Sequence, residues 1–364
     1  MKRIYLDYAA LTPIDKGVIK IMNKYSKDEY TNPSALYHSA VNAKKVLDES
    51  RLKIANILHA HSDEIIFNSG GTESNHLILN NFTNKNIIIS SIEHSSIINY
   101  VNSISDNVIR IPVDENGILD LEILKNSITE KTDLISIIMV NNEIGTLQSI
   151  NEISKIIRDA KKKFNKEIFF HIDACQAITH YPLYIEKLGV DSITLDSHKV
   201  YGPRGIGILF IKRNTIKINR EGTYNIPSIV GFTYALELNE KIREKETERI
   251  IYLKNYFLSE LLKINSLIKV NGNLNNSSPH ILNISIPNID SEYFVLQLDA
   301  KGIECSTKSA CLRDENESYV IKAINGNSGN SLRFSFGRKT SKGDLKRVIN
   351  IIKKILINNV SIKK

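Results

Sequence analysis

Short apolar runs alternate with helix-like segments between about residues 60 and 215. The runs lie at residues 65–67, 87–89, 134–140, 167–172 and 192–195. Between two of them, Ile153, Ile156 and Ile157 recur at helical spacing. Short, largely apolar strands between helices indicate a parallel sheet that is covered on both faces. We therefore expect an α/β fold, with a mainly parallel sheet covered by helices.

The pattern changes near residue 240. Residues 240–249 are rich in charge and in helix formers, so they predict the start of a long connecting helix, and residues 280–286 alternate like a strand with one wet face. A helix at 291–300, a strand at 331–336 and a helix at 342–356 follow. We predict a large domain at 15–245, a small C-terminal α/β domain at 246–364, and an N-terminal segment, 1–14, packed with the small domain.

Composition excludes several classes of protein. With 364 residues, 42% of them hydrophobic, the chain is too apolar for disorder, and no apolar run approaches the ~20 residues that span a bilayer. The N-terminus reaches Asp7 before a long apolar stretch, which argues against a secretion signal and favours the cytoplasm. The net charge of +8 reflects an abundance of lysine rather than a nucleic-acid module. We therefore expect neither a membrane nor a nucleic-acid partner.

The cysteine pattern indicates neither a disulfide framework nor a metal site. The chain has three cysteines, Cys175, Cys305 and Cys311, and none has the spacing of a structural zinc site. Cys175 and Cys305 adjoin apolar runs and are expected to be packing residues. Cys311 instead precedes a charged stretch typical of an exposed loop, where nearby cations favour the reactive thiolate.

Polar clusters follow four of the apolar runs, at residues 70–73, 141–145, 173–176 and 196–199. In an α/β sheet, ligands bind beyond the carboxyl ends of the strands, so four such clusters predict one shared site. The first cluster, Gly70-Gly71-Thr72-Glu73, would present the N–H groups of a helix start to a phosphate.

Asp173 and Lys199 belong to two of these clusters, on successive strand ends. A lysine amine and a carboxylate are the pair that pyridoxal phosphate needs, because the amine forms a Schiff base and the carboxylate keeps the pyridine nitrogen protonated. His94, at the start of a helix-like segment, would either stack on the ring or cap the helix. Arg333 would bind a substrate carboxylate or form a structural salt bridge, and its pattern does not choose between them.

The chain resembles the cysteine desulfurases, class-V aminotransferase-like members of the fold type I pyridoxal-phosphate enzymes. The shared motifs stand in the family's order at residues 5–10, 32–34 with His38, 69–74, 93–94, 140–145, 173–176, 197–199, 309–311 and 333–335. The resemblance covers nearly the whole chain.

The resemblance implies a role for each matching residue in taking sulfur from L-cysteine. Lys199 would carry the cofactor, Cys311 would receive the sulfur as a persulfide, and His94 would stack on the ring. The remaining cofactor contacts would come from Gly71, Thr72, Asn142, Asp173, Gln176, Ser197 and His198. Thr223 would reach the phosphate from the other subunit of a homodimer, and the substrate would be bound by Arg333, Asn32 and His38. The sulfur would pass to an acceptor such as an iron–sulfur scaffold or a tRNA sulfurtransferase.

The chain departs from the family pattern near the phosphate. The family carries a serine where this chain has Asp196, and a carboxylate facing a phosphate is repulsive unless it turns away or is protonated. A glycine- and histidine-rich loop before Thr223 is absent, and Lys308 stands where the family prefers glycine. These departures keep open a catalytically weakened subunit that serves binding or assembly. A selenocysteine lyase also stays open, because it would need the same lysine and the same carboxylate-binding residue.

Overall fold

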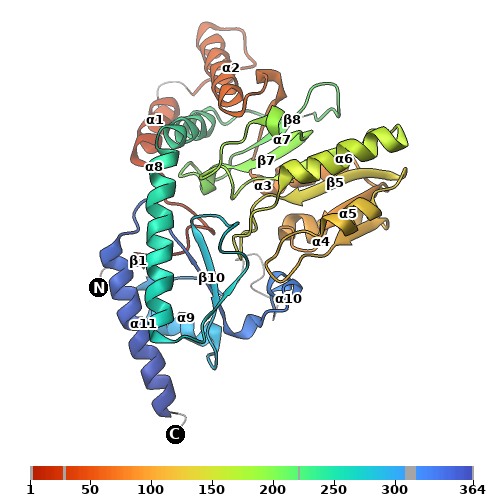
Figure 1. The fold of residues 1–364 in the computed structure, drawn as a ribbon. Helices are drawn as coiled ribbons and strands as arrows, with labels where there is room; N and C mark the ends of the chain where they lie inside the picture. Colours follow the sequence, from red (N-terminus) through yellow and green to blue (C-terminus); the bar gives the residue numbers. More distant parts are fainter. Residues whose placement is uncertain (1–2, 28–29, 220–221, 308–316, 363–364) are drawn as a thin grey trace.

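The computed structural model describes residues 3–27, 30–219, 222–307 and 317–362, which form a larger and a smaller α/β unit (Figure 1). The strands are β1 (Ile4–Tyr5), β2 (Ile65–Asn68), β3 (Asn86–Ser90), β4 (Val108–Ile111), β5 (Thr132–Ile138), β6 (Phe169–Asp173), β7 (Ser192–Asp196), β8 (Gly207–Ile211), β9 (Lys269–Asn271), β10 (Ile281–Ser285), β11 (Ile303–Glu304) and β12 (Ser331–Ser335). The α-helices are α1 (Lys16–Lys27), α2 (His38–Leu58), α3 (Gly71–Asn80), α4 (Ser95–Ile104), α5 (Leu121–Ser127), α6 (Ile150–Phe164), α7 (Ile185–Leu188), α8 (Ile226–Ile264), α9 (Ser291–Asp299), α10 (Tyr319–Ala323) and α11 (Lys342–Ile362). Short 3-10 turns are η1 (Ser62–Glu64), η2 (Ser197–Lys199) and η4 (Ser328–Asn330).

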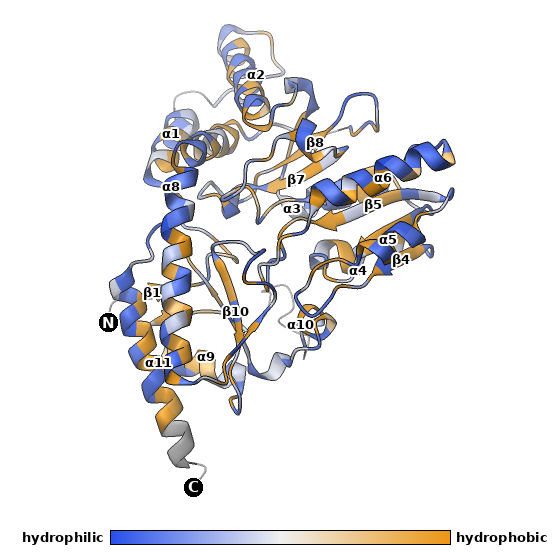
Figure 2. Ribbon diagram, viewed as in Figure 1, coloured by the Kyte–Doolittle hydropathy of each residue, from blue (hydrophilic) through white to orange (hydrophobic). Residues whose placement is uncertain are grey.

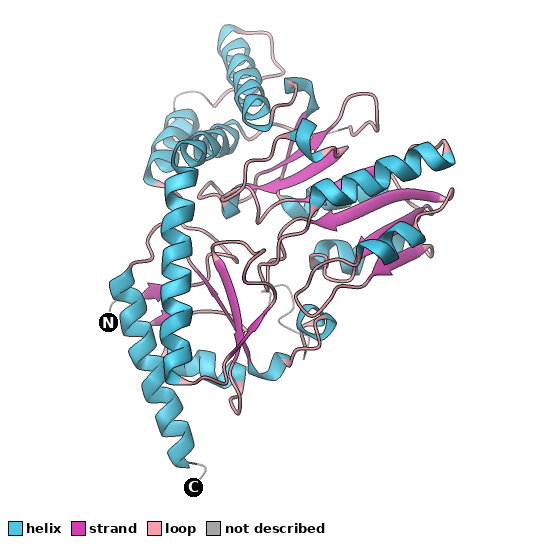
Figure 3. Cartoon of the chain, in the orientation of Figure 1, coloured by secondary structure: helices cyan, strands magenta, loops and turns pink. Residues whose placement is uncertain are grey.

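The larger unit is built on a seven-stranded sheet with the order β2-β8-β7-β6-β5-β3-β4. Figure 3 shows its strands in magenta beside the cyan helices that cover them. Neighbouring strands from β7 to β4 are parallel, whereas β8 is antiparallel to both β7 and β2. This arrangement confirms the predicted α/β fold with a mainly parallel sheet. The carboxyl ends of β5, β6 and β7 therefore meet at one edge.

Burial explains why these runs form strands. All five residues of β6, β7 and β8 are buried, so each strand is covered on both faces. The covering helix α6 buries Ile150, Ile153 and Ile157 and ends in three lysines, which suit the negative end of the helix dipole. Its polar outer face is blue in Figure 2, above the orange strands.

The smaller unit joins the two ends of the chain. A three-stranded antiparallel sheet has the order β12-β10-β9, and β1 pairs in parallel with β11, with Ile4 opposite Ile303. Ile4 and Leu6 lie in the same apolar core as Phe257 and Phe334. Across the described residues, no helix combines the length and apolar character that a membrane crossing requires.

The long helix α8 begins fourteen residues earlier than residues 240–249 predicted. Its start is marked by Asn225, whose side chain accepts a hydrogen bond from the Ser228 N–H, and by Pro227 in the first turn. The helix packs in the larger core through Leu236 and in the smaller core from Ile250 onward. The charged stretch is therefore the part of α8 between two cores, not its beginning.

The other predicted elements are present, with shifts at their ends, and α11 runs six residues beyond the predicted 342–356. The wet face expected for residues 280–286 is wrong, because Ile281, Leu282, Asn283 and Ile284 of β10 are all buried. The strand predicted at 134–140 is β5, which begins and ends two residues earlier. Val140 instead bridges Leu147 in the following turn, outside the sheet. Apolar character persists into this turn because it stays buried, so hydropathy alone could not mark the strand's end.

Candidate functional site

One cavity lies at the carboxyl ends of β5, β6 and β7, where the sequence predicted a shared site. It is lined by Ala9, Ala10, Gly71, Thr72, Asn75, His94, Ile138, Asn142, Asp173, Cys175, Gln176, Asp196, His198, Lys199 and Arg333. Every residue predicted to contact the cofactor is in this lining except Ser197 and Thr223. The fold thus gathers residues that lie more than 300 positions apart in the chain.

Lys199 ends the turn that follows β7, and its amine is held by the N-terminal segment. The Nζ atom donates hydrogen bonds to the carbonyl oxygens of Ala9 (2.8 Å) and Ala10 (2.9 Å). Burial lowers the pKa of Lys199 from its usual range, although the nearby carboxylate of Asp196 opposes that shift. A partly desolvated amine with a lowered pKa is easier to deprotonate, and the neutral amine is the form that attacks carbonyl groups.

Asp173 is the last residue of β6, and its two oxygens have separate donors. Oδ1 accepts from the backbone N–H of Cys175, and Oδ2 accepts from the side-chain amide of Asn75, both at 3.0 Å. Asn75 itself lies on α3 and also contacts His171, whose pKa is lowered by burial to about 4. Because the His171 imidazole is neutral, it places no second charge near Asp173. Asn75 therefore orients the Asp173 carboxylate through its own hydrogen bond.

Gln176 links the cavity to a buried histidine pair. Its amide donates to the Ala9 carbonyl at 2.8 Å, and its Oε1 lies 3.0 Å from Nε2 of His280. His280 stacks on His180 with ring centroids 4.9 Å apart, and burial lowers the pKa of both rings. Gln176 therefore has a fixed orientation, set by an acceptor at one end and an imidazole at the other.

His94 fulfils one of its two predicted roles and remains available for the other. Its Nδ1 accepts the Ser96 N–H at 3.2 Å, which caps α4, while its ring lines the cavity. Asn142 also lines the cavity, and its backbone carbonyl accepts from Arg333. Ring stacking by His94 stays a prediction. A side chain that caps α4 can also present its ring to a ligand in the cavity.

The first N–H of α3, predicted to bind a phosphate, is bound by Asp196. Gly71 N donates to Asp196 Oδ2 at 2.7 Å, and Oδ1 lies 2.5 Å from Nδ1 of His198. Burial alone would raise the pKa of Asp196, but the hydrogen bond and charge of His198 and the Gly71 N–H outweigh it and hold the pKa below its usual range. Asp196 is therefore ionised, and it faces the helix start rather than turning away.

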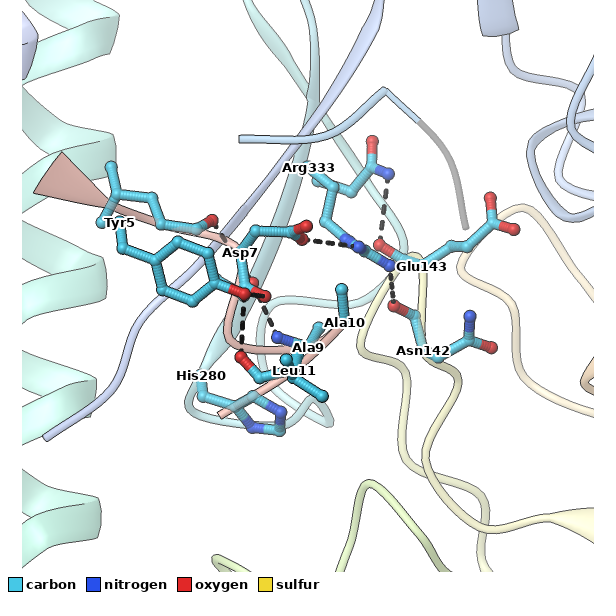
Figure 4. A network of polar contacts seen from close by, with 12 residues as sticks. Tyr5, Asp7, Ala9, Ala10, Leu11, Asn142, Glu143, His280 and Arg333 are labelled. Atoms are coloured by element: carbon cyan, nitrogen blue, oxygen red, sulfur yellow. Dashed lines mark hydrogen bonds and ion pairs between the residues drawn. The ribbon is translucent and has the colours of Figure 1, made fainter. Parts of the chain in front are cut away.

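Arg333 has both a structural partner and a place in the cavity. It is 1% exposed; Nη2 contacts Asp7 Oδ1 at 2.7 Å and Nη1 donates to the Asn142 carbonyl at 2.9 Å (Figure 4). The salt-bridge alternative is thus present in the structure. The substrate-binding alternative stays a prediction, because Arg333 also lines the cavity.

Several predicted residues do not reach the cavity. Ser197 is fully buried, and its hydroxyl has no hydrogen-bond partner among the described residues. Asn32 and Thr223 line a separate surface cavity, and His38 is an exposed residue at the start of α2. Cys311 and Lys308 lie outside the described residues.

Four contacts at the site escaped sequence reasoning. Asn75, Asp7, His280 and the carbonyls of the Ala9-Ala10 segment all orient predicted residues. Asn75 carries a usable signal, because it lies four residues after Gly71 and so shares its helix face. Cys175, predicted to be a packing residue, instead lines the cavity, whereas Cys305 packs against the smaller core.

The residues in the cavity fit pyridoxal phosphate at its reactive end. A partly desolvated amine and an oriented carboxylate lie in one cavity, as the aldehyde and the ring nitrogen of this cofactor require. An added Cβ on Gly71 would lie 2.9 Å from Cys175 Sγ, so glycine is needed for the close approach at the start of α3. Within the described ranges, no group of three or more His, Cys, Asp or Glu side chains could hold a metal ion.

Comparisons with known proteins find relatives that match nearly the whole chain. The model of the family described as Aminotransferase class-V matches residues 4–220 and 214–348. Cysteine desulfurase IscS of Dictyoglomus turgidum is 37% identical over 98% of this chain and 95% of the relative. The IscS of Methanosarcina thermophila is 35% identical over 98% and 92%.

Solved structures give the same picture. A NifS-like protein has a TM-score of 0.89 at 29% identity and covers 98% of this chain and 99% of its own. A NifS-like protein from Rickettsia africae has a TM-score of 0.86 at 31% identity with the same coverage. SspA in complex with cysteine has a TM-score of 0.75 at 27% identity and covers 92% of this chain and 99% of its own.

Proposed function

Because this chain belongs to the cysteine desulfurases of the class-V aminotransferase family, which are pyridoxal-phosphate enzymes, we propose that it removes sulfur from L-cysteine with Lys199 carrying the cofactor and Cys311 accepting the sulfur. The observation that carries this proposal is the cavity that brings Lys199, Asp173 and Arg333 together. These are the amine, the acid and the cation that an amino-acid substrate and this cofactor need.

Pyridoxal phosphate supplies an aldehyde that reacts with amines and a protonated ring that withdraws electrons from the substrate. Lys199 would hold it covalently and would also move protons, since burial lowers its pKa and so makes the amine easier to deprotonate. Asp173 would hold the ring proton, with its carboxylate fixed by Asn75 and by the Cys175 N–H. His94, Asn142 and Gln176 would position the ring within the cavity.

Arg333 would bind the carboxylate of L-cysteine, since a guanidinium binds carboxylates in a bidentate manner. The thiolate of Cys311 would attack the substrate sulfur. The carbon–sulfur bond of cysteine then breaks, a sulfur–sulfur bond forms on Cys311, and the carbon gains a proton to become alanine. Although Cys311 lies outside the described residues, its sequence neighbours Lys308 and Arg313 favour the thiolate.

The persulfide would pass to a protein acceptor, such as an iron–sulfur scaffold or a tRNA sulfurtransferase. We further propose a homodimer in which Thr223 and its neighbours face the partner's cofactor. Support comes from the position of Thr223. Together with Asn32 it lines a surface cavity that is separate from the Lys199 cavity of the same chain. The neighbour SspA, solved with cysteine, supports L-cysteine as the substrate.

The test is stoichiometric sulfur release by the holoenzyme. With L-cysteine and a thiol reductant, the protein should form equal amounts of sulfide and alanine. Cys311→Ala should abolish sulfide release while the absorbance of the bound cofactor stays unchanged, and Cys305→Ala, in the small-domain core, is the matched control. Undiminished sulfide release by Cys311→Ala would contradict the assigned acceptor, and turnover of selenocysteine without turnover of cysteine would contradict the assigned substrate.

A further inference from the structure

The start of α3 is bound by an anion of the chain itself. Asp196 Oδ2 accepts the Gly71 N–H at 2.7 Å, while Oδ1 accepts the His198 backbone N–H at 3.1 Å and lies 2.5 Å from the His198 ring. Two of the residues expected to contact the cofactor, Gly71 through its backbone N–H and His198, are therefore both engaged by one carboxylate. Asp196 is mostly buried, with 9% of its side chain exposed, so solvent screens this contact weakly.

The carboxylate lies in the space that two glycines leave open. A Cβ added to Gly70 would lie 2.9 Å from Asp196 Oδ2, and one added to Gly71 would lie 3.5 Å from the same atom. Gly70 also has a φ of +153°, a backbone conformation that side chains rarely adopt. An anionic ligand that accepts a hydrogen bond from the Gly71 N–H must therefore occupy the space in which Asp196 Oδ2 lies.

Because both are anions, the Asp196 carboxylate and a ligand phosphate would compete for the start of α3 rather than share it. A helix N-terminus carries only about half a positive elementary charge, and a phosphate monoester carries about −1.5 to −2 at pH 7. Two anions at this helix start would repel one another, although His198 pairs with Asp196 and Lys199 lies near enough for the Asp196 charge to act on its pKa. A neutral ligand that lacks the phosphate would not meet this repulsion.

We propose that Asp196 is an internal competitor for the cofactor's 5′-phosphate and sets the selectivity of this cavity between phosphorylated and unphosphorylated pyridoxal. The inference rests on the proposed function, because it takes the ligand of the cavity from it. Asp196 lowers the affinity for pyridoxal 5′-phosphate and leaves the affinity for pyridoxal nearly unchanged. It is thus a specificity-determining residue that acts at the phosphate end of the cavity.

The experiment compares binding of two ligands to the full-length apoprotein. The dissociation constants of pyridoxal 5′-phosphate and pyridoxal are measured from the absorbance of the bound ligand, for the native chain, Asp196→Asn and Asp196→Ser. Asparagine keeps the size of the side chain and removes its charge, whereas serine removes both. Asp191→Asn is the matched control, since Asp191 is equally buried next to the other end of β7, where its carboxylate accepts the Phe170 N–H.

In Asp196→Asn and Asp196→Ser, the ratio of the two dissociation constants should move at least about tenfold in favour of the phosphorylated ligand. Asp191→Asn should leave the ratio unchanged. Using the ratio separates selectivity from any general loss of stability, and either of the two variants suffices if the other fails to fold.

An unchanged ratio in a variant that still binds both ligands would overturn the role of Asp196 and leave the proposed function intact. Weaker binding of pyridoxal 5′-phosphate by Asp196→Asn, with pyridoxal unaffected, would also overturn it, because Asp196 would then assist the phosphate through His198. If the native chain bound neither ligand, both this inference and the proposed function would fail.

Discussion

The Arg333 guanidinium lies 2.7 Å from the Asp7 carboxylate, so the cation expected to bind a substrate carboxylate already has one within the chain. The pair joins β12 of the smaller unit to the N-terminal segment, and the second arm of Arg333 reaches the Asn142 carbonyl of the larger unit. A substrate carboxylate would meet a guanidinium whose orientation is already fixed from two sides.

Replacing each member of this pair separates substrate binding from structural support. We expect Arg333→Lys to raise the KM for L-cysteine by about tenfold or more, because an ammonium group cannot make the bidentate contact. Asp7→Asn should lower the free energy of unfolding by about 1–3 kcal/mol, less than for a fully buried pair because Asp7 is partly exposed, and should leave KM within about threefold. Steady-state kinetics and urea unfolding measure the two effects. A purely structural role for Arg333 would be indicated if both variants lost stability and neither changed KM.

Lys199 should be the residue that carries the cofactor. Its amine is oriented by two carbonyl oxygens and lines the cavity, so borohydride should fix the cofactor to this residue alone. Lys199→Ala should lose the attachment and nearly all activity. Mass spectrometry of the reduced protein provides the measurement.

The matched control for Lys199 is Lys254→Gln. Lys254 is also a buried lysine, with its Nζ bonded to the Ser278 carbonyl at 2.9 Å, and burial lowers its pKa to about 8, yet it lies outside the cavity lining. The variant should keep the attachment at Lys199. Attachment at Lys254 in the native protein would contradict the assignment.

Asn75 should be a positioning residue that acts through Asp173. Asn75→Ala removes the N–H donor of Asp173 Oδ2, and we expect about a tenfold loss of cofactor affinity, as for a lost hydrogen bond to a charged group. The absorbance of the bound cofactor should also titrate at a different pH, which a merely structural role would not change. Asn239→Ala is the control, because Asn239 is 2% exposed and bonds the carbonyls of Ile178 and Thr179 instead. An unaltered titration in Asn75→Ala would refute the role.

Glu93 should make the protein less stable as the pH rises from about 4.5 to about 8. Its side chain is fully buried, Oε1 accepts from the Ile138 N–H, and Oε2 has no partner among the described residues. Burial raises the pKa of Glu93 to about 8 from an ordinary 4.5. Between these two values the folded chain keeps a proton that the unfolded chain has lost, so the free energy of unfolding falls as the pH rises.

The useful range for testing Glu93 is pH 6.5 to 8. At lower pH, buried His171 and His180, with pKa values lowered to about 4 and about 3, act in the opposite direction because only the unfolded chain protonates them. Over this range the native chain should lose about 2 kcal/mol more stability than Glu93→Gln. Urea unfolding at several pH values measures the difference, with Glu152→Gln on the exposed face of α6 as the control. Equal pH slopes in the native chain and Glu93→Gln would exclude this role.

The sequence by itself predicted the sheet and the principal site residues. Parallel strands buried on both faces are usually apolar, so runs such as residues 87–89 stand out from the chain on hydropathy alone. Ligand sites follow the carboxyl ends of such strands, which is why Asp173 and Lys199 could be assigned to one site before any contact was known. Both inferences depend on local pattern and on a general rule of α/β topology.

Other features depended on the three-dimensional structure. Asn225 and Pro227 mark the start of α8 locally. The dense charge further along the chain instead predicts a helix start at residue 240. That charge lies where the helix passes between two cores, and no local pattern reports such a position.

The tertiary structure also decided the partners of the charged groups. Arg333 pairs with Asp7 across 326 residues, Asp173 with Asn75 across 98, and Asp196 with the Gly71 N–H across 125. The sequence gives the chemistry of each group, because side-chain type sets charge and hydrogen-bonding capacity. Which two groups meet depends on how separate strands and helices pack, and packing brings together parts of the chain that share no local pattern.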